Sequence, residues 1–268
     1  MTADFQDKVV LVTGASSGIG RACAIEFSKR GAKLVLGART VDALEEVVQE
    51  LPGEAIAVAT DVTSQESCKH FVERAKEQFG QIDILINNAG ISMRAELKEA
   101  DLDVFRQLMD INFFGSLYCT SYALDSIIER KGTIVGVSSI AGYRGLPGRS
   151  GYSASKYALQ GWLEAVRTEL LDTGVHVMWV CPGYTTSNIR HAALTEKGQP
   201  QGESPLEEGK LASADETAKK ILHAIKKRKR TLVMTFTGKQ TVFLNKFFPG
   251  LADKLVRNFF YKEGKLMK

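Results

Sequence analysis

The sequence lacks the features that mark secreted, membrane-spanning and metal-binding proteins. It contains four Cys and four His in 268 residues, and neither type shows the close spacing of a metal site or a redox-active pair. We therefore expect reduced, buried thiols and no metal. No apolar run reaches the ~20 residues that a membrane-spanning helix needs. The first apolar segment begins within ten residues of Met1, which leaves no room for a secretory signal. We expect a soluble, cytoplasmic protein.

The chain has the size and the apolar content of one α/β domain. With 44% hydrophobic residues it can bury a large core. Segments typical of strands alternate with segments typical of helices. The expected strands are 9–12, 33–38, 55–59, 83–86, 133–137 and 175–180, and the expected helices are 19–31, 41–51, 64–79, 102–130 and 152–172. This alternation predicts a doubly wound, Rossmann-type parallel sheet with helices on both faces and ligands at the carboxyl ends of the strands.

The stretch KVVLVTGASSGIG at residues 8–20 is the feature around which the chain is organised. An apolar strand leads into a turn containing Gly14, Gly18 and Gly20, and a helix follows. Glycines let the backbone turn tightly and approach a ligand, while the first N–H groups of the helix attract a pyrophosphate. A purely structural turn is the alternative. The strand before it and the helix after it favour a dinucleotide site.

The ends of the next strands carry residues that select and support such a cofactor. Ala38 and Arg39 occupy the position where an acidic residue would bind the ribose of NAD, and a cation there favours the 2′-phosphate of NADP. A solvated arginine is the alternative. Asp61 either caps its loop or binds an adenine amino group. Asn87–Gly90 combines small residues with amides that can tie strand ends together, unless it is a plain turn.

Tyr152 and Lys156 stand four residues apart on an expected helix, so their side chains share one face. An ammonium ~4 Å from the phenol, at an effective dielectric constant near 20, contributes roughly 4 kcal/mol, or about three pK units. We therefore expect Lys156 to lower the pKa of Tyr152 enough for proton exchange with a carbonyl or alcohol oxygen. Ser139 follows the fifth strand, where its hydroxyl can hold the same oxygen. Ser138 is an alternative by position.

Together these residues resemble the short-chain dehydrogenase/reductase family. The matching pieces occur in family order and cover residues 8 to about 225: TGASSGIG at 13–20, Asp61, NNAG at 87–90, Asn112, Ser139, YSASK at 152–156, and Pro182 with Gly183. The resemblance implies hydride transfer between a nicotinamide and a carbonyl or secondary alcohol. It further implies that Tyr152 is the acid/base, that Ser139 orients the substrate oxygen, that Lys156 also binds the nicotinamide ribose, and that Asn112 supports a water-linked proton relay. Without the resemblance, Asn112 reads as a helix-bending or capping residue.

The resemblance also implies the cofactor-binding set and the assembly. For NADP(H), the expected residues are Gly14, Ser16, Ser17, Gly18, Ile19, Gly20, Arg39, Asp61, Val62, Asn88, Ala89, Gly90, Tyr152, Lys156, Pro182, Gly183, Thr185 and Ser187. Ser187 stands where the family often has Thr. A homodimer or homotetramer is the expected assembly. We expect a small-molecule substrate, with no metal and no nucleic acid.

The substrate is described only as a class. Met93, Tyr143, Leu146 and Tyr184 are expected to line a pocket for a bulky, partly apolar carbonyl or alcohol, and Arg94 and Arg144 to face an anionic group or solvent. The polar stretch 184–213 is expected to be a lid rather than a disordered loop. Alternatives are a reductase of 3-oxoacyl thioesters or sugars and, in a different class, a non-catalytic NADP(H)-binding sensor or scaffold.

The C-terminal segment 226–268 is strongly basic. Twelve Lys or Arg against two acids give it a charge of +10, so residues 1–225 carry −6 of the overall +4. The dinucleotide-binding and catalytic domain is expected over 1–238, with an amphipathic extension of the same domain over 239–268. Two short helices separated near Pro249 and Gly250 are predicted. Their apolar faces pack on the parent domain or a second subunit, or else attach to an anionic membrane surface.

Overall fold

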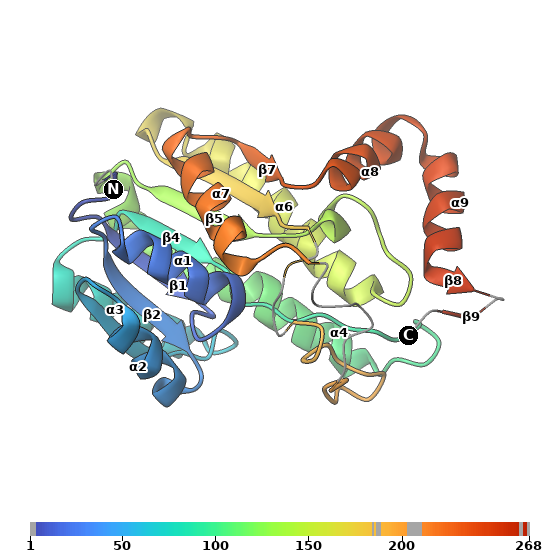
Figure 1. Ribbon diagram of the computed structural model, residues 1–268, viewed down its shortest axis with the longest axis horizontal. Coiled ribbons are helices and arrows are strands. Elements are labelled where there is room, and N and C mark those ends of the chain that lie inside the picture. Colours follow the sequence, from blue (N-terminus) through green and yellow to red (C-terminus); the bar gives the residue numbers. More distant parts are fainter. Residues whose placement is uncertain (1–3, 184, 186–188, 203–210, 263–264, 267–268) are drawn as a thin grey trace.

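The computed structural model describes residues 4–183, 185, 189–202, 211–262 and 265–266. Its centre is a seven-stranded parallel sheet in the order β3-β2-β1-β4-β5-β6-β7 (Figure 1). The strands are β1 (Val9–Thr13), β2 (Lys33–Ala38), β3 (Ala55–Ala59), β4 (Ile84–Asn87), β5 (Thr133–Val137), β6 (His176–Cys181) and β7 (Thr231–Val233). The sheet and its helices confirm the predicted doubly wound fold.

Most helices fall where the apolar spacing predicts them. They are α1 (Gly18–Ser28), α2 (Val41–Glu50), α3 (Gln65–Phe79), α4 (Leu102–Met109), α5 (Gly115–Glu129), α6 (Ser150–Glu169), α7 (Ala214–Lys226), α8 (Phe236–Phe247) and α9 (Pro249–Phe260). A π-helical turn, η1 (Asp110–Phe114), divides the expected helix 102–130. Helix α7, strand β7 and the hairpin β8 (Tyr261–Lys262) with β9 (Lys265–Leu266) have no counterpart among the predicted elements.

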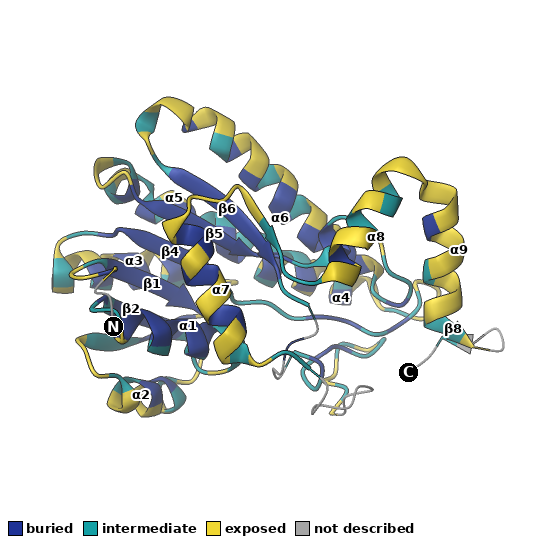
Figure 2. Ribbon diagram, turned by 45° about the horizontal axis from the view of Figure 1, so that its top comes forward, coloured by how far each residue is buried: buried dark blue, intermediate teal, exposed yellow. Residues whose placement is uncertain are grey.

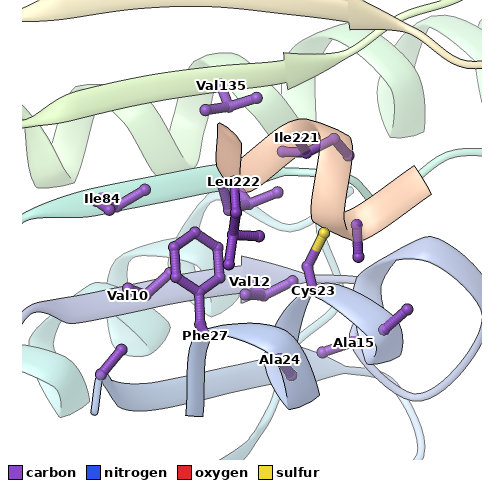
Figure 3. Packing of buried hydrophobic residues seen from close by; sticks show 14 of the residues in the cluster. Val10, Val12, Ala15, Cys23, Ala24, Phe27, Ile84, Val135, Ile221 and Leu222 are labelled. Atoms are coloured by element: carbon purple, nitrogen blue, oxygen red, sulfur yellow. The ribbon is translucent and has the colours of Figure 1, made fainter. Parts of the chain in front are cut away.

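The central strand β1 lacks polar alternation because both of its faces are buried. On one face, Val10 and Val12 pack beneath Phe27 of α1 and Leu222 of α7 (Figure 3). On the other face, Leu11 belongs to a second apolar cluster that α3, α5 and α6 cover. The cysteines Cys23, Cys68, Cys119 and Cys181 are free and buried. This two-layered core fixes the carboxyl ends of the strands along one edge of the sheet.

Side chains join the ends of β1 and β4 at that edge. The hydroxyl of Thr13 accepts hydrogen bonds from the backbone N–H groups of Asn88 and Ala89, both at 3.0 Å. The amide of Asn88 donates to the carbonyls of Thr13 and Gly14, at 2.9 and 3.1 Å. The prediction that asparagines here tie neighbouring strand ends together is confirmed. The glycine-rich turn and the segment Asn87–Gly90 are thereby held side by side.

The basic segment 226–268 does not form one surface. Lys226 pairs with Asp4 at 2.8 Å, and Arg228 donates to the carbonyl of Gly174, also at 2.8 Å. These contacts place the run KKRKR at residues 226–230 beside the amino ends of the strands. Helices α8 and α9 instead follow the carboxyl end of β7 and lie at one end of the molecule, beyond the sheet (Figure 1). The charge concentrated in the sequence is therefore divided between opposite edges.

Polar contacts hold the α8–α9 pair to the parent domain. Arg144 donates to the side chain of Asn245 at 3.0 Å and forms an ion pair with Asp253. Asn245 in turn donates to the carbonyl of Tyr143 at 2.7 Å. Among the described residues, no helix has both the length and the apolar character needed to cross a bilayer.

Candidate active site

A cavity of about 1060 Å³ lies at the carboxyl edge of the sheet. Its lining includes all of the predicted cofactor-binding residues except Gly20 and Ser187. Ser187 lies outside the described residues. Gly20 is buried, and an added Cβ would collide with the carbonyl oxygen of Gly14, so it serves the close packing of the turn rather than the lining. Sixteen of the eighteen positions that the resemblance implies thus lie in one cavity.

The glycine-rich turn has the geometry of an anion cradle. Gly14 and Gly18 have φ values of +64° and +53°, which side-chain-bearing residues rarely adopt. An added Cβ on Gly14 would also lie 3.0 Å from the Cα of Ala89. Ser17 is the N-cap of α1, yet its side chain makes no capping hydrogen bond. The first N–H groups of the helix therefore remain available to a pyrophosphate.

The cavity wall near β2 and β3 is where the adenosine end of a dinucleotide would bind. Ala38, the last residue of β2, and the exposed Arg39 that follows it line this wall. Asp61 also lines it, and its carboxylate accepts hydrogen bonds from the backbone and the hydroxyl of Thr63, at 3.0 and 2.8 Å. Capping the loop is thus a demonstrated role of Asp61. An NAD site would be expected to have an acidic residue at the end of this strand. This chain has Ala38 and Arg39 there.

Ser139, Tyr152 and Lys156 all line the cavity and lie close to one another. Ser139 lies two residues after β5 and caps a short 3₁₀ helix, η2 (Ile140–Gly142), and a hydrogen bond to Ser139 lowers the pKa of Tyr152. Ser138 instead accepts a hydrogen bond from Gln160 at 2.8 Å. Of the two serines considered, Ser139 is therefore the one that contacts Tyr152.

Burial dominates the electrostatics of this group. It lowers the pKa of Lys156 to about 8, while the ammonium donates to the carbonyl of Val137 at 2.8 Å. Burial also raises the pKa of Tyr152, against the lowering effects of the Ser139 hydrogen bond and the charge of Arg149. The expected net lowering by Lys156 is therefore wrong for this structure. The Lys156 ammonium lies 5.8 Å from the centre of the Tyr152 ring, and desolvation of the phenolate outweighs the charges around it.

Asn112 lies in the π-helical turn η1 and is fully buried. Its side-chain oxygen accepts from the backbone N–H of Ile91 at 2.8 Å, and its amide donates to the carbonyl of Ile91 at 2.9 Å and to the hydroxyl of Ser155 at 2.8 Å. Asn112 therefore joins the segment after β4 to helix α6. An added Cβ on Gly90 would lie 3.0 Å from the Asn112 oxygen and 3.4 Å from the Lys156 nitrogen. This part of the cavity accepts a flat group only because Gly90 has no side chain.

The expected substrate-contacting residues divide into two groups. Met93, Arg94 and Leu146 line the cavity. Tyr143 does not, because its hydroxyl accepts from the indole N–H of Trp179 at 2.9 Å. Arg144 does not either, because it holds α8 and α9, so the expectation that it faces an anion or solvent is wrong. Tyr184 lies outside the described residues, as does much of the expected lid. The described part of that stretch contributes Ile189, Arg190, Ala192 and Ala193 to the lining.

The far wall of the cavity comes from residues that sequence reasoning did not assign to the site. Helices α8 and α9 contribute Thr237, Gly238, Gln240, Thr241, Leu244, Ala252, Leu255, Val256, Phe259 and Phe260. The i, i+4 spacing of Leu251, Leu255 and Phe259 predicts an apolar face. It does not say that part of this face borders the cavity. In the described part of the chain, no group of three or more His, Cys, Asp or Glu residues is placed to hold a metal ion.

Comparison with known proteins agrees with this geometry. The sequence model of a family described as short chain dehydrogenase matches residues 8–198. The chain is 37% identical over 272 residues to dehydrogenase/reductase SDR family member 7B of Mus musculus, covering 98% of this chain and 84% of that protein. It is also 37% identical over 238 residues to an uncharacterized oxidoreductase of Listeria monocytogenes, covering 87% of this chain and 96% of that one.

Solved structures show the same likeness. A short-chain dehydrogenase/reductase from Burkholderia phymatum in complex with NAD superposes with a TM-score of 0.83 at 27% identity, covering 92% of this chain and 96% of that one. An alcohol dehydrogenase from Thermococcus sibiricus complexed with 5-hydroxy-NADP superposes with a TM-score of 0.73 at 28% identity, covering 85% of this chain and 96% of that one.

Proposed function

Because the chain belongs to the short-chain dehydrogenase/reductase family, we propose that it is an NADP(H)-dependent oxidoreductase that interconverts a bulky, partly apolar carbonyl compound and its secondary alcohol. The observation that carries the proposal is the meeting of Ser139, Tyr152 and Lys156 in a cavity that also contains the glycine-rich turn. A pure binding module needs no proton donor at this position. The assembly as a homodimer or homotetramer and the cytoplasmic location remain predictions.

The residues of the cavity suit a nicotinamide dinucleotide. The turn from Gly14 to Gly18 and the start of α1 would hold the pyrophosphate, Arg39 the 2′-phosphate, and Lys156 the nicotinamide ribose. Bound there, the nicotinamide supplies or accepts the hydride. The preference for NADP(H) is supported by the exposed cation Arg39 and by the absence of a carboxylate at Ala38 and Arg39. Related structures contain either NAD or an NADP derivative, so this preference needs its own test.

The proton is handled by this chain's own groups. Tyr152, with its raised pKa, carries its proton at neutral pH and can give it to a carbonyl oxygen during reduction. Ser139 donates a second hydrogen bond to that oxygen and so fixes its position. Lys156 has a pKa of about 8, so it is mostly charged at neutral pH, and its ammonium would bind the nicotinamide ribose. From the family resemblance, we also propose that Asn112 supports the return of a proton to Tyr152 through water.

A bulky, partly apolar substrate is supported by the far wall of the cavity. The lining contributed by α8 and α9 combines apolar side chains such as Leu244 and Val256 with the polar side chain of Gln240. A 3-oxoacyl thioester or a sugar is the alternative substrate of the same reaction class.

The acid/base assignment is tested by Tyr152→Phe, with Tyr157→Phe as the matched control on the same helix. Tyr157 is half exposed and donates its hydroxyl proton to the Tyr143 carbonyl, outside the cavity lining. We expect Tyr152→Phe to abolish NADPH-dependent reduction across a panel of ketones, aldehydes, steroids and oxoacyl thioesters, with little change in NADPH affinity. Retention of a third or more of the activity would contradict the assignment. A wild-type protein that binds NADPH but reduces nothing in the panel would favour the sensor or scaffold alternative.

The cofactor preference is tested by titrating NADPH and NADH into wild-type protein and Arg39→Ala, with the exposed Arg106→Ala as control. A charge-assisted phosphate contact is worth about 1.5 to 3 kcal/mol, which corresponds to roughly ten- to hundredfold in affinity. We expect Arg39→Ala to weaken NADPH binding by that factor and NADH binding much less. An unchanged ratio of the two affinities would remove Arg39 from this role.

A further inference from the structure

Helices α8 and α9 expose most of the large apolar side chains found on the described surface. Seven such side chains are between 48% and 76% exposed: Phe236, Phe243, Phe247, Phe248, Leu251, Leu255 and Phe259. Only four others are comparably exposed in the described residues: Leu97, Leu102, Tyr157 and Leu171. We call these seven residues the α8–α9 face. Figure 2 shows both helices as largely exposed.

The parent domain does not cover this face. The Phe243 ring lies 4.9 Å from the Phe247 ring and 6.4 Å from the Phe248 ring, centre to centre, so these aromatics pack on one another. Contacts to the parent domain include the polar contacts of Arg144 with Asn245 and Asp253 and the contact of Arg149 with the Phe260 ring. An exposed apolar cluster such as that of Phe243, Phe247 and Phe248 usually marks an interaction site. The expectation that the apolar faces pack on the parent domain therefore fails for these side chains.

The same helices are cationic. Residues 236–262 contain Lys239, Lys246, Lys254, Arg257 and Lys262 against the single acid Asp253, a net charge of +4. Asp253 is paired with Arg144 of the parent domain. The Lys246 ammonium lies 5.5 Å from the centre of the Phe247 ring, so cations and aromatics alternate on the surface. The occupant of the face has to satisfy both apolar and cationic groups.

Charge decides between a second copy of the chain and a lipid surface. In a symmetric dimer the face would meet itself, so two surfaces of charge +4 would be pressed together. Buried dimer interfaces are also depleted in lysine. An anionic membrane surface matches both components, because aromatic and aliphatic side chains enter the boundary of the acyl chains while lysine and arginine reach the headgroups.

We propose that the α8–α9 face binds the surface of a membrane that contains anionic lipid. Leu255 and Phe259 belong both to this face and to the cavity lining, so the docked surface would adjoin the cavity wall. A lipid-dissolved carbonyl compound then reaches the cavity without crossing bulk water; this step alone rests on the proposed function. The KKRKR run at 226–230 lies at the opposite edge of the sheet and takes no part in docking.

Sedimentation of the full chain with vesicles tests the proposal. We expect binding to vesicles of phosphatidylcholine mixed with phosphatidylserine at low salt, weaker binding at high salt, and little binding to phosphatidylcholine alone. Equal binding to both compositions, or to neither, would overturn the proposal. Binding that ignores salt would also overturn it, because the cations would then contribute nothing.

Two pairs of variants locate the docking surface. Lys246→Glu with Lys254→Glu should weaken binding about tenfold or more, whereas the matched change Lys227→Glu with Lys229→Glu at the opposite edge should leave most of it. Phe243→Ser with Phe247→Ser should weaken binding about tenfold, and the exposed Leu171→Ser should not. Neither Phe243 nor Phe247 lines the cavity, so reduction of a water-soluble ketone should survive this change. If the change at Lys227 and Lys229 weakened vesicle binding more than the change at Lys246 and Lys254, the assignment of docking to the α8–α9 face would be wrong.

Sedimentation velocity without lipid tests the alternative occupant of the face, which is a second copy of the chain. If the wild-type chain is a dimer that Phe243→Ser with Phe247→Ser converts to a monomer, the face is a subunit interface and the membrane proposal is wrong. If the variant keeps the wild-type oligomeric state but loses vesicle binding, the proposal stands. Vesicle binding needs no turnover, so failure of the proposed enzymatic function leaves this result unaffected.

Discussion

Replacing Lys156 by methionine should make the protein's stability respond differently to pH. Burial lowers the pKa of Lys156 from 10.5 to about 8 in the folded protein. The folded state therefore loses this proton at a lower pH than the unfolded state does. Between those two values the unfolded state binds more protons, so the free energy of unfolding rises with pH. Below pH 8 both states are protonated and the full cost of burying the ammonium is present.

The magnitude follows from the two pKa values. Between pH 7 and pH 9.5, linkage predicts that the wild-type free energy of unfolding rises by about 2 kcal/mol relative to Lys156→Met. The variant also leaves the Val137 carbonyl without its donor, a cost of about 1 to 3 kcal/mol. That cost does not vary with pH, so it shifts the stability difference without changing its pH dependence.

Urea unfolding at several pH values between 7 and 9.5 measures the difference, provided that the denaturant slope is unchanged. Lys227→Met, at an exposed position, is the matched control for the loss of a lysine side chain. A difference between wild type and Lys156→Met that stays constant within about 0.5 kcal/mol would show that Lys156 is not desolvated as described.

Three further predictions concern other parts of the molecule. Gly90→Ala should lower kcat/KM by about tenfold and cost about 1 kcal/mol of stability, because its Cβ would crowd Asn112 and Lys156; steady-state kinetics and urea unfolding measure both. Arg144→Ala removes the contacts to Asn245 and Asp253, so limited proteolysis within residues 236–262 should become roughly fivefold faster. Burial raises the pKa values of Cys23 and Cys181 to about 12, so mass spectrometry should find neither alkylated by iodoacetamide at pH 8 until the protein is unfolded.

The parts of the fold that follow from local pattern could be predicted from sequence. Strand β2 begins and ends at the expected residues, Lys33 and Ala38, because a buried parallel strand reads as a continuous apolar run. The convergence of the glycine-rich turn, Ser139 and Tyr152 also follows, since all three come after strands or begin helices at the carboxyl edge. Once the parallel sheet is recognised from the sequence, its topology places these residues at the same edge.

What could not be predicted depends on three-dimensional environment. The spacing of Tyr152 and Lys156 indicates a shared helix face, but it contains no information on how much water surrounds them, and desolvation decides the pKa of Tyr152. Likewise, Lys226 and Lys239 are near in sequence, yet β7 passes between them and carries them to opposite edges. The role of Arg144 depends on partners about a hundred residues later in the chain.

Helices α8 and α9 form the far wall of the cavity, and this affects how the substrate range can change among homologous enzymes. The wall around the glycine-rich turn and Tyr152 belongs to the central sheet and its flanking helices, whose residues also form the core. The wall that would meet the bulk of the proposed substrate belongs to α8 and α9, which follow β7 and make polar contacts with the parent domain through Arg144 and Asn245. Exchange of residues 236–262 between homologous enzymes should therefore transplant substrate range as a module while the hydride-transfer machinery is inherited unchanged.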